Sequence, residues 1–495
     1  MQNRKDFKIE TVYTGPEYDR YYSGNELANP QIVLKGKTYV KPEPEEEFNG
    51  VVPTMADVKV QIDADILSKH FLIVGGIGMG KTNTFLSMTE QIIAKCKEDD
   101  VMVIFDTKGD FYNAFGNHED KNDIFVSNAP LNDNKGNQKT SSEDEIWNIF
   151  KELDPEKLTE SAHEIAGMIF ADLLKNSGQP FFPMAARAIF TSVLRSMARR
   201  PNLFNQKLSN KLLKEFFDGF DVWKKSSSFS SFEEEKHTTV LSNIIDLLTL
   251  DDKESGVISY LSPDGNVESN GQTQGIIAEL RLVIDQIFVG NFAKVGNFSI
   301  RETVRNRGAK KVYIQYDITE GNTLTPIYSL LIDLAIKESL ETRHGKKGNA
   351  YFIVDEFKLL PNLNHIDDAV NFGRSIGVKF IIGVQNISQI INNYGEDNAK
   401  NILSGFSSVI AYRVADYETR KYLVDMLGEN KKRIAYLSAI SSRGVIESVE
   451  RANVVEDWDI LNLDVGECII RLAKKYGEKE SNPFFLKVDE YKKQG

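Results

Sequence analysis

The sequence predicts an α/β fold, in which a parallel central sheet with crossover helices is interrupted by an inserted all-α domain. Between about residues 56 and 126, short apolar runs alternate with helical periodicity, which is typical of parallel strands joined by helices. From about residue 140 to 285, helical repeats follow one another and no comparable strand is predicted. Sheet character then returns in four segments, which are residues 311–318, 350–357, 378–385 and 407–414.

These changes of pattern divide the 495 residues into five segments. Residues 1–55 are polar, contain the acidic run KPEPEEE, and are expected to form an N-terminal segment or linker. Residues 56–140 are expected to form the first part of the α/β domain, and residues 286–480 its second part. Residues 141–285 would be the all-α insertion, and residues 481–495 a C-terminal tail.

The composition favours an ordinary globular protein, with 41% hydrophobic and 27% charged residues. The longest apolar runs are about five residues, whereas a membrane-spanning helix needs about 20. We therefore expect no segment that crosses a bilayer, and the first residues lack the apolar region of a secretory signal. Cys96 and Cys468 lie in apolar patterns and are expected to be small buried hydrophobic residues in a reducing cytoplasm. The net charge of -12 argues against a protein that coats nucleic acid with its whole surface. It does not exclude a local basic channel.

A phosphate-binding motif lies within FLIVGGIGMGKTNTF, where Gly75, four residues, and then Gly80, Lys81 and Thr82 match G-x-x-x-x-G-K-[ST]. The glycines let several backbone N–H groups point at one phosphate, the lysine neutralises phosphate charge, and the threonine hydroxyl ligates Mg²⁺. A glycine-rich turn without ligand is the alternative, but a strand is predicted directly before the loop and a helix directly after it. The expected ATP-binding residues are Gly75, Gly76, Ile77, Gly78, Met79, Gly80, Lys81, Thr82 and Asn83.

A nucleotide site also needs a carboxylate for Mg²⁺ and a base for the attacking water. Three predicted strands end in an aspartate, at Asp106, Asp317 and Asp355, and only Asp355 is followed by a second acid, Glu356. We therefore expect Asp355 to hold Mg²⁺ together with Thr82, and Glu356 to orient and deprotonate the water. The alternative for Glu356 is that it caps the following turn.

Two more side chains fit a site of this kind. Gln385 ends a predicted strand, where its amide would lie beside the γ-phosphate and report whether it is present. Arg374 lies between Glu356 and that strand, and in a ring assembly such an arginine can reach the nucleotide of a neighbouring subunit. A buried, satisfied amide for Gln385 and a surface salt bridge for Arg374 stay open as alternatives.

A helix is predicted between Glu356 and Arg374, in NHIDDAVNFGRS. This helix would carry the arginine away from its own phosphate loop and toward an edge of the domain. Its expected buried side consists of Ile366, Ala369, Val370 and Phe372.

Several motifs together resemble the TraG/TraD-type coupling proteins of conjugation and type IV secretion, within the FtsK/HerA superfamily of ring-forming motor ATPases. They are HFLIVGGIGMGKT, FDTKGDFY, YFIVDEFKLLPNL, FGRSIGVKFIIGVQNISQIINNYG and DYETRKYLVDMLG, and they follow the family's order from about residue 58 to 475. The resemblance implies a RecA-like motor domain with an inserted all-α domain, which binds ATP and Mg²⁺. It also supports Arg374 as a finger acting in trans, Gln385 as a sensor, and Asp106 with Lys108 as a second motif near the nucleotide.

The resemblance further implies a homo-hexamer that hydrolyses ATP and moves DNA toward a secretion channel. The DNA would be single- or double-stranded, with a relaxase-bound single strand as the expected cargo, and the protein partners would be the relaxase or relaxosome and channel proteins. Family members usually carry two membrane-spanning helices before the motor, whereas this chain has a polar stretch there. Either the anchor was left off, or the chain represents a soluble branch that docks on a separate membrane protein or serves another DNA task. The expected location is the cytoplasm, or the inner face of the cell membrane through a partner or a missing anchor.

Direct signs of nucleic-acid binding are limited to clusters of basic residues, which can either contact phosphates or form ordinary solvated faces. The clusters are Arg187, Arg195, Arg199 and Arg200, and Lys431, Lys432 and Arg433. Two functions therefore stay open. The first is a ring-forming ATPase that moves DNA, which Glu356 and Arg374 favour. The second is a nucleotide-gated protein that recruits a relaxase or other protein cargo without translocation, which the acidic charge balance favours.

Overall fold

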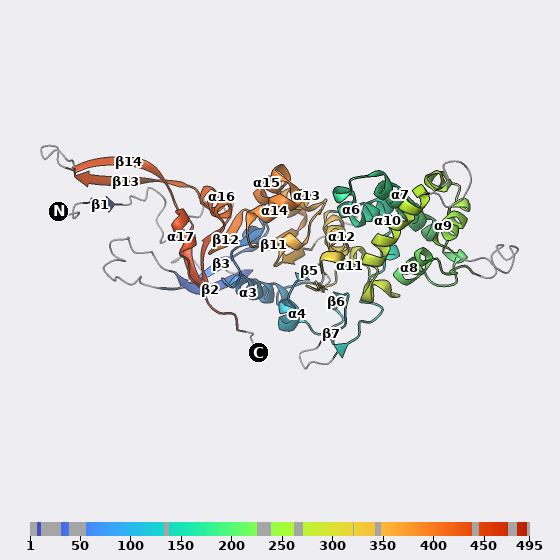
Figure 1. Cartoon of the computed structure of the whole chain (residues 1–495). Helices are drawn as coiled ribbons and strands as arrows, with labels where there is room; N and C mark the ends of the chain where they lie inside the picture. Colours follow the sequence, from blue (N-terminus) through green and yellow to red (C-terminus); the bar gives the residue numbers. More distant parts are fainter. Residues whose placement is uncertain are drawn as a thin grey trace. The chain divides into compact units, whose positions relative to one another are not determined.

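A computed structural model describes ten stretches of the chain (Figure 1). They are residues 7–10, 31–38, 56–132, 138–224, 239–261, 271–319, 321–341, 348–437, 445–473 and 483–492. The chain divides into two compact units. Unit 1 comprises Met1–Cys96, Tyr351–Lys358 and Val370–Gly495, and unit 2 comprises Lys97–Ala350 and Leu359–Ala369.

Unit 1 is built on strands in the order β3-β2-β16-β15-β12-β4-β11-β10. Strand β4 lies between β11 and β12 and is parallel to both, whereas the pairs from β12 outward to β3 are antiparallel. The residues of β4, β10, β11 and β12 are all buried, as expected for apolar strands covered on both faces. The bounds are β2 (Ile32–Thr38), β3 (Ala56–Ile62), β4 (Phe71–Val74), β10 (Ala350–Val354), β11 (Val378–Val384), β12 (Ser408–Tyr412), β15 (Glu467–Arg471) and β16 (Phe484–Val488).

The longer helices of unit 1 follow the strands of this sheet. Helix α3 begins directly after the glycine-rich loop, and its residues Phe85, Met88 and Ile92 are buried, as their helical spacing predicted. A separate antiparallel sheet has the order β1-β13-β14. The elements are α2 (Ala64–Leu67), α3 (Lys81–Ile93), the 3₁₀ turns η6 (Phe357–Leu359) and η7 (Gly373–Ile376), α14 (Ile387–Tyr394), α15 (Glu396–Ser404), α16 (Tyr417–Leu427), α17 (Asp457–Leu461), β1 (Phe7–Glu10), β13 (Glu429–Leu437) and β14 (Val445–Asn453).

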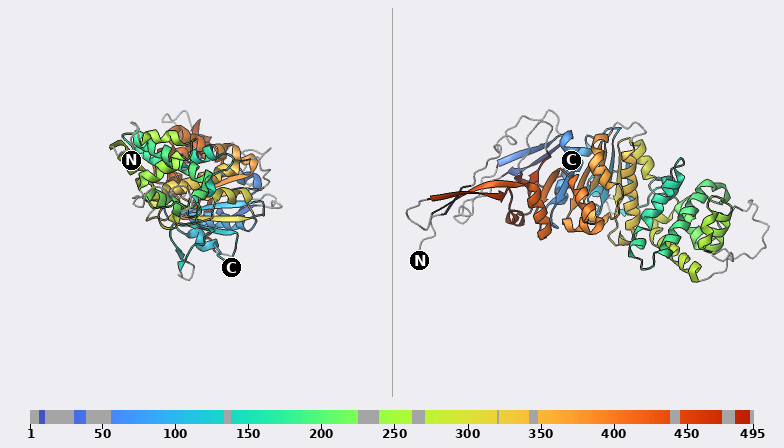
Figure 2. Two further views of the ribbon diagram at one scale, coloured as in Figure 1. Left: turned by 90° about the vertical axis from the view of Figure 1, so that its right-hand side faces the viewer. Right: turned by 90° about the horizontal axis from the view of Figure 1, so that it is seen from above.

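Unit 2 combines three parallel strands, in the order β5-β9-β6, with most of the helices of the chain. Among the described residues between 141 and 285 every named element is an α-helix or a 3₁₀ turn, which confirms the predicted helical character (Figure 2, green). The elements are β5 (Val101–Asp106), α4 (Asp110–Phe115), β6 (Asp123–Ser127), β7 (Leu131–Asn132), β8 (Gln138–Lys139), η2 (Ile149–Glu152), α5 (Leu158–Ile169), α6 (Ala171–Asn176), α7 (Phe181–Arg199), η3 (Pro201–Leu203), α8 (Asn210–Asp218), α9 (Val240–Thr249), η4 (Ser255–Tyr260), α10 (Gly271–Ile287), η5 (Gly290–Ala293), α11 (Ile300–Asn306), β9 (Lys310–Gln315) and α12 (Gly321–Leu340).

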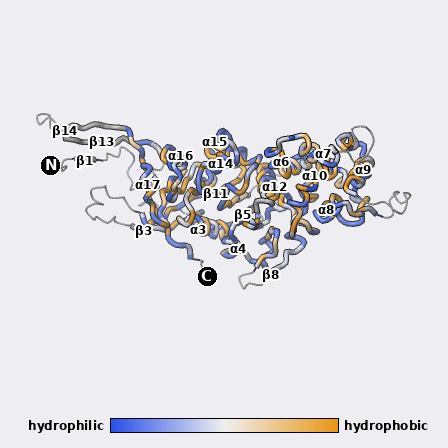
Figure 3. Tube along the Cα trace, in the orientation of Figure 1, coloured by the Kyte–Doolittle hydropathy of each residue, from blue (hydrophilic) through white to orange (hydrophobic). Residues whose placement is uncertain are grey.

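The core of unit 2 is formed by amphipathic helices around α7, which packs against α5, α9 and α10. Hydrophobic and hydrophilic residues alternate along these helices (Figure 3). Glu152 is fully buried at the start of α11 and accepts hydrogen bonds from Trp147 Nε1, Ser299 Oγ and the backbone N–H groups of Ile300 and Arg301. Burial raises the pKa of Glu152 despite these donors. This carboxylate therefore satisfies the free N–H groups of a helix end inside the core.

Two strands lie in segments that the sequence analysis treated as terminal. Strand β2 lies within the expected N-terminal linker and β16 within the expected C-terminal tail, and both pair in the sheet of unit 1. In β16, Phe484, Leu486 and Val488 are buried while the residues between them are more exposed, which is the alternation of a half-buried strand. The acidic run at 41–47 lies outside the described residues. The predicted boundaries at 55, 140, 285 and 480 stay predictions.

The predicted helix before Arg374 is present as α13 (Ile366–Phe372), followed by the turn η7. Ile366, Ala369 and Val370 are buried as predicted, but Phe372 is 72% exposed, so its assignment to the buried side is wrong. A helix turns about 100° per residue, which places Gly373 rather than Phe372 in line with Ile366, and Gly373 is buried.

Two further expectations concern single residues and membranes. Cys468 is buried as predicted, whereas Cys96 is half-buried. Within the described stretches, none of the helices combines the length and the apolar character that crossing a membrane requires.

Candidate nucleotide site

The glycine-rich loop joins β4 to α3 in unit 1. Gly78 and Gly80 have φ angles of 75° and 113°, a left-handed conformation that glycine adopts without strain. Helix α3 begins at Lys81 with Gly80 as its N-cap, and no side chain caps this end. Free N–H groups at a helix N-terminus, together with the helix dipole, attract an anion. The loop therefore has the backbone of a phosphate site.

Tyr412 packs against the loop, and it was not among the residues predicted from the sequence. This side chain is fully buried, and its hydroxyl lies 2.5 Å from Thr84 Oγ1 on α3. A Cβ atom at Gly75 would lie 2.6 Å from Tyr412 Cβ, so the loop requires glycine there. Gly466 N also donates to Met79 O of the loop at 3.0 Å. The available signal for Tyr412 was an aromatic residue at the carboxyl end of a predicted parallel strand.

The Lys81 side chain lies within the loop itself. Its Nζ is 2.5 Å from Gly75 O and 3.1 Å from Gly76 O, and the residue is buried. A positive charge is thereby held where the backbone N–H groups of the loop would meet a phosphate.

The side chain of Asn83, expected in the ATP-binding set, contacts the C-terminal segment of unit 1. Its Nδ2 donates to Asp489 O at 2.9 Å, and its Oδ1 accepts from Tyr491 N. Any contact of Asn83 with phosphate would therefore come from its backbone N–H.

The acid pair predicted from the sequence follows β10. Thr82 Oγ1 lies 3.3 Å from Asp355 Oδ2, so the loop hydroxyl and this carboxylate meet at one point. Strand β11 passes close by, since a Cβ atom at Gly383 would lie 2.2 Å from Asp355 O. The structure therefore brings together the two residues that were expected to bind Mg²⁺.

Glu356 and Gln385 contact each other directly. Gln385 Nε2 donates to Glu356 Oε2 at 2.8 Å. The other oxygen, Glu356 Oε1, is buried without a hydrogen-bond partner in the described part of the chain, and Lys358 Nζ lies 3.8 Å from it. The carboxylate bonds a side chain rather than a backbone N–H, which differs from the geometry of a turn cap. Gln385 is a half-buried amide, and one of its two N–H donors bonds Glu356.

Arg374 forms a salt bridge at the surface of unit 1. Its Nη2 lies 2.6 Å from Asp65 Oδ1, and its Nε donates to Ser68 Oγ at 3.1 Å. Lys69 and then Arg374 hold the pKa of Asp65 below its usual value. Within one chain Arg374 thus adopts the salt bridge that the sequence left open, and an exposed pair of this kind contributes only about 0 to 1 kcal/mol.

Asp106, which the resemblance linked to the nucleotide, has local partners in unit 2. Its Oδ2 accepts from Tyr112 N at 2.8 Å and from Gln315 Nε2 at 2.9 Å. Burial raises its pKa, although these bonds oppose the shift. Lys108 is exposed.

Half of the basic cluster in the helices of unit 2 is paired. Arg195 contacts Glu254 at 2.6 Å, and Arg199 contacts both Asp251 at 3.0 Å and Glu254 at 2.8 Å. Arg187 is half-buried and Arg200 is exposed. The second cluster, Lys431, Lys432 and Arg433, lies on β13, and its side chains are outside the described part of the structure.

Comparison with known proteins identifies the family. Residues 54–269 and 262–476 match the type IV secretion-system coupling protein DNA-binding domain. The chain belongs to this family, which confirms the resemblance to TraG/TraD-type coupling proteins. Coupling protein TraD of Escherichia coli K12 is 22% identical over 433 residues, which cover 85% of this chain and 53% of TraD. The chain thus spans about half the length of that relative. VirD4 of Bartonella quintana is 27% identical over 135 residues, 26% of this chain and 21% of VirD4.

Solved structures of the coupling protein TrwB share the fold. Unbound TrwBΔN70 has a TM-score of 0.62 at 17% identity and covers 88% of both chains. TrwB in complex with ADP and Mg²⁺ has a TM-score of 0.61 at 15% identity and covers 95% of this chain and 97% of TrwB. TrwB has also been solved with the non-hydrolysable analogues ADPNP and GDPNP. The likeness confirms the predicted α/β class, a RecA-like sheet with an all-α part.

Proposed function

We propose that this coupling protein binds ATP with Mg²⁺ and hydrolyses it to move DNA toward a type IV secretion or conjugation channel. The observation that carries the proposal is the convergence of Thr82, Asp355, Glu356 and Gln385 in unit 1. Two contacts, Thr82 with Asp355 and Gln385 with Glu356, fall on consecutive residues directly after β10, and each joins this point to a different element of unit 1. The TrwB complexes with ADP and Mg²⁺ and with nucleotide analogues support the same ligand class.

The donor set fits a magnesium nucleotide. Hydroxyl and carboxylate oxygens are the ligands that Mg²⁺ prefers, and Thr82 Oγ1 with Asp355 Oδ2 supplies one of each. Thr82 and Asp355 would hold the ion, directly or through water, and the ion would neutralise phosphate charge when bound. Lys81, now on the loop carbonyls, would turn to the β- and γ-phosphates.

Glu356 is suited to be the base that removes a proton from water. Gln385 donates to one carboxylate oxygen and so fixes the plane of the group. The other oxygen, Oε1, has no hydrogen-bond partner among the described residues and is the atom that would accept the proton. Through the same bond Gln385 would report the γ-phosphate to the base, which extends its expected role as a sensor.

The partners follow from the family and from Arg374. The family description names a DNA-binding domain, which supports single- or double-stranded DNA as the substrate and a relaxase or channel protein as the protein partner. We propose a homo-hexamer in which Arg374 leaves Asp65 and reaches the nucleotide of the next subunit. Because the salt bridge with Asp65 is exposed, releasing it costs little.

A nucleotide-gated recruitment protein is the second candidate function. Arg195 and Arg199 favour it, because both are engaged by acidic residues of the same unit and offer less charge to DNA phosphates. Such a gate would bind ATP and a relaxase or other protein cargo, and it would turn over nucleotide slowly whether or not DNA is present.

The deciding experiment measures ATP and GTP turnover with no DNA, with single-stranded DNA and with double-stranded DNA, at low and moderate salt. A motor should be stimulated by DNA, and the stimulation should fall steeply as salt rises, because phosphate contacts release counterions. The Glu356→Gln chain serves as the inactive control. Turnover that DNA leaves unchanged at every salt concentration would favour the gate. No turnover above the control would contradict hydrolysis.

A further inference from the structure

The segment that follows the acid pair is fixed by its polar side chains to helices of unit 2. Lys358 is the last residue of this stretch in unit 1, and Leu359–Ala369 belongs to unit 2. Asn362 Nδ2 donates to Asp172 Oδ1 on α6 at 2.9 Å, and Asn364 Nδ2 lies 2.9 Å from Met168 Sδ on α5. The segment from Leu359 to His365 therefore begins three residues after Glu356 and ends among helices.

His365 makes the strongest of these attachments, through Asp333 on α12. Asp333 Oδ1 accepts from His365 N at 2.9 Å, and Asp333 Oδ2 lies 2.8 Å from His365 Nδ1. The Asp333 side chain is fully buried. A buried carboxylate is costly without donors, so Asp333 holds both the backbone and the ring of His365 in one orientation.

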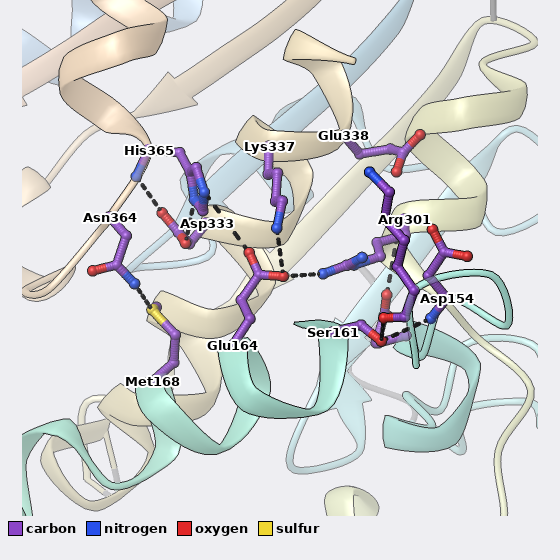
Figure 4. A network of polar contacts seen from close by, with 12 residues as sticks. Asp154, Ser161, Glu164, Met168, Arg301, Asp333, Lys337, Glu338, Asn364 and His365 are labelled. Atoms are coloured by element: carbon purple, nitrogen blue, oxygen red, sulfur yellow. Dashed lines mark hydrogen bonds and ion pairs between the residues drawn. The ribbon is translucent and has the colours of Figure 1, made fainter. Parts of the chain in front are cut away.

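Glu164 on α5 faces the other nitrogen of the same ring. Its Oε1 is 3.8 Å from His365 Nε2 and is buried without a hydrogen-bond partner in the described residues. Its Oε2 accepts from Lys337 Nζ at 2.8 Å and from Arg301 Nη2. Figure 4 shows Glu164 between the ring of His365 on one side and the two cations on the other. Glu164 Oε1 therefore faces His365 Nε2, a nitrogen that can carry a proton.

The charges around the His365 ring decide whether a metal ion or a proton lies between His365 Nε2 and Glu164 Oε1. Asp333 and Lys337 face it from α12, Glu164 faces it from α5, and Arg301 from α11 reaches the same carboxylate. A divalent cation at this point would add charge beside Lys337 and Arg301, whereas a proton on Nε2 supplies the one missing donor.

We propose that His365 is a positioning residue for the nucleotide site: its ring ties the segment following Glu356 to α5 and α12, so that changes at the acid pair reach the helices of unit 2. The inference rests on the proposed function, because it assumes that Glu356 responds to nucleotide. His365 touches no atom of the candidate site among its described contacts, and it acts through the chain that separates it from Glu356.

The tie depends on pH in a defined direction. Burial acts to lower the pKa of His365, but the hydrogen bond and charge of Asp333, with the charge of Glu164, outweigh it and raise the pKa above 6.5. A raised folded-state pKa means that the stabilisation is complete below the unfolded-state value and is lost as pH rises through the folded-state value. Neutral His365 keeps the Nδ1 bond to Asp333 and loses the Nε2 donor that faces Glu164.

Amide hydrogen exchange on the full chain tests the tie without using activity. In the wild type, exchange in residues 359–366, corrected for intrinsic rates, should be about tenfold slower at about pH 6 than at pH 8.5. In His365→Gln, which keeps a donor for Asp333 but does not titrate, the difference should disappear. His163→Gln on the exposed face of α5 is the matched control and should behave as wild type. A pH-independent wild type overturns the part of the tie that protonated His365 makes with Glu164, and this measurement needs no variant to fold.

The same method tests transmission. Mg·ATP should change exchange in α12 of the wild type, and His365→Gln should reduce that change about tenfold while nucleotide affinity stays the same. A full response in α12 of His365→Gln overturns the proposed transmission. A wild type that binds no nucleotide overturns the proposed function instead, and its pH series still decides whether the tie exists.

Discussion

Glu152 in unit 2 and Glu356 in unit 1 both have buried carboxylate oxygens, and they differ in the number of hydrogen-bond donors that they receive. In unit 2, Glu152 accepts four hydrogen bonds, and Asp333 accepts on both oxygens from His365. In unit 1, Glu356 receives a hydrogen bond from the described residues on one oxygen only, although the other oxygen is also buried. A buried oxygen without a donor costs about 1 to 3 kcal/mol, and at Glu356 the proposed attacking water can supply the missing donor. The number of donors therefore separates the structural carboxylate Glu152 from the one proposed to be catalytic.

The largest effect is expected at Lys81, the lysine of the phosphate-binding motif. Lys81→Ala should abolish productive ATP binding, because it removes the only side-chain cation of the loop. Isothermal titration with Mg·ATP measures the affinity, and Lys421→Ala on the surface of α16 is the control for losing one lysine. Unchanged ATP affinity would contradict the assignment of the loop as the phosphate-binding site.

Glu356→Gln should keep ATP binding and slow hydrolysis by up to about 10⁴-fold, because an amide fits the space but cannot accept the proton of water. Single-turnover hydrolysis measures the chemical step, with Glu418→Gln as a control at an exposed glutamate. A normal rate would mean that another residue is the base, and the contrast between Glu152 and Glu356 would have no functional meaning.

Arg374→Ala should bind ATP normally and lose turnover on the order of 10³-fold if the arginine acts on a neighbour. Mixing this chain with Lys81→Ala chains should restore part of the activity, because an intact loop of one chain can meet an intact arginine of the other. Mass measurement must show that mixed assemblies form. If mixed assemblies form and activity is not restored, Arg374 does not act on a neighbouring subunit, and the salt bridge with Asp65 is its remaining assigned role.

Glu152→Ala, at the carboxylate with four donors, should destabilise unit 2 by about 3 kcal/mol, because these buried donors lose their acceptor. Urea unfolding measures the loss, and Glu152→Gln should cost less because it keeps an acceptor oxygen. Nucleotide affinity of the folded chain should not change. If Glu152→Ala were as stable as the wild type, the four hydrogen bonds that Glu152 accepts would not indicate a structural role.

The smallest effect is expected at Tyr412. Tyr412→Phe removes the hydroxyl that contacts Thr84 beneath the loop and should lower the free energy of unfolding by about 1 kcal/mol. Thermal melts with and without Mg·ATP separate loss of stability from loss of binding. A loss as large as that of Glu152→Ala would assign Tyr412 a wider role in the core.

Local patterns allowed much of this structure to be predicted. The strands at the loop and at the acid pair, and the helix after the loop, follow from runs of neighbouring apolar residues and from glycine spacing. The meeting of Thr82 with Asp355 was predictable because the carboxyl ends of parallel strands share one edge of a sheet. The roles of these residues stay predictions.

What the sequence could not predict depends on residues far apart in the chain. Tyr412 supports Gly75 from a strand more than 300 positions later, and no spacing within the loop records that contact. The partner of Arg374 was likewise undefined, because Asp65 lies in a different segment. Strand β16 carried a readable alternation, but its short length and terminal place concealed it.

The strand order of unit 1 has a consequence for how the chain folds as it is made. Strand β4, which precedes the loop, pairs with β11 and β12, and these leave the ribosome some 300 residues later. Unit 2 is nearly continuous in sequence, from Lys97 to Ala350, and can begin to fold while β4 still waits for its neighbours. We therefore expect the phosphate loop to be among the last parts of a newly synthesised chain to reach its folded conformation, after the helices of unit 2.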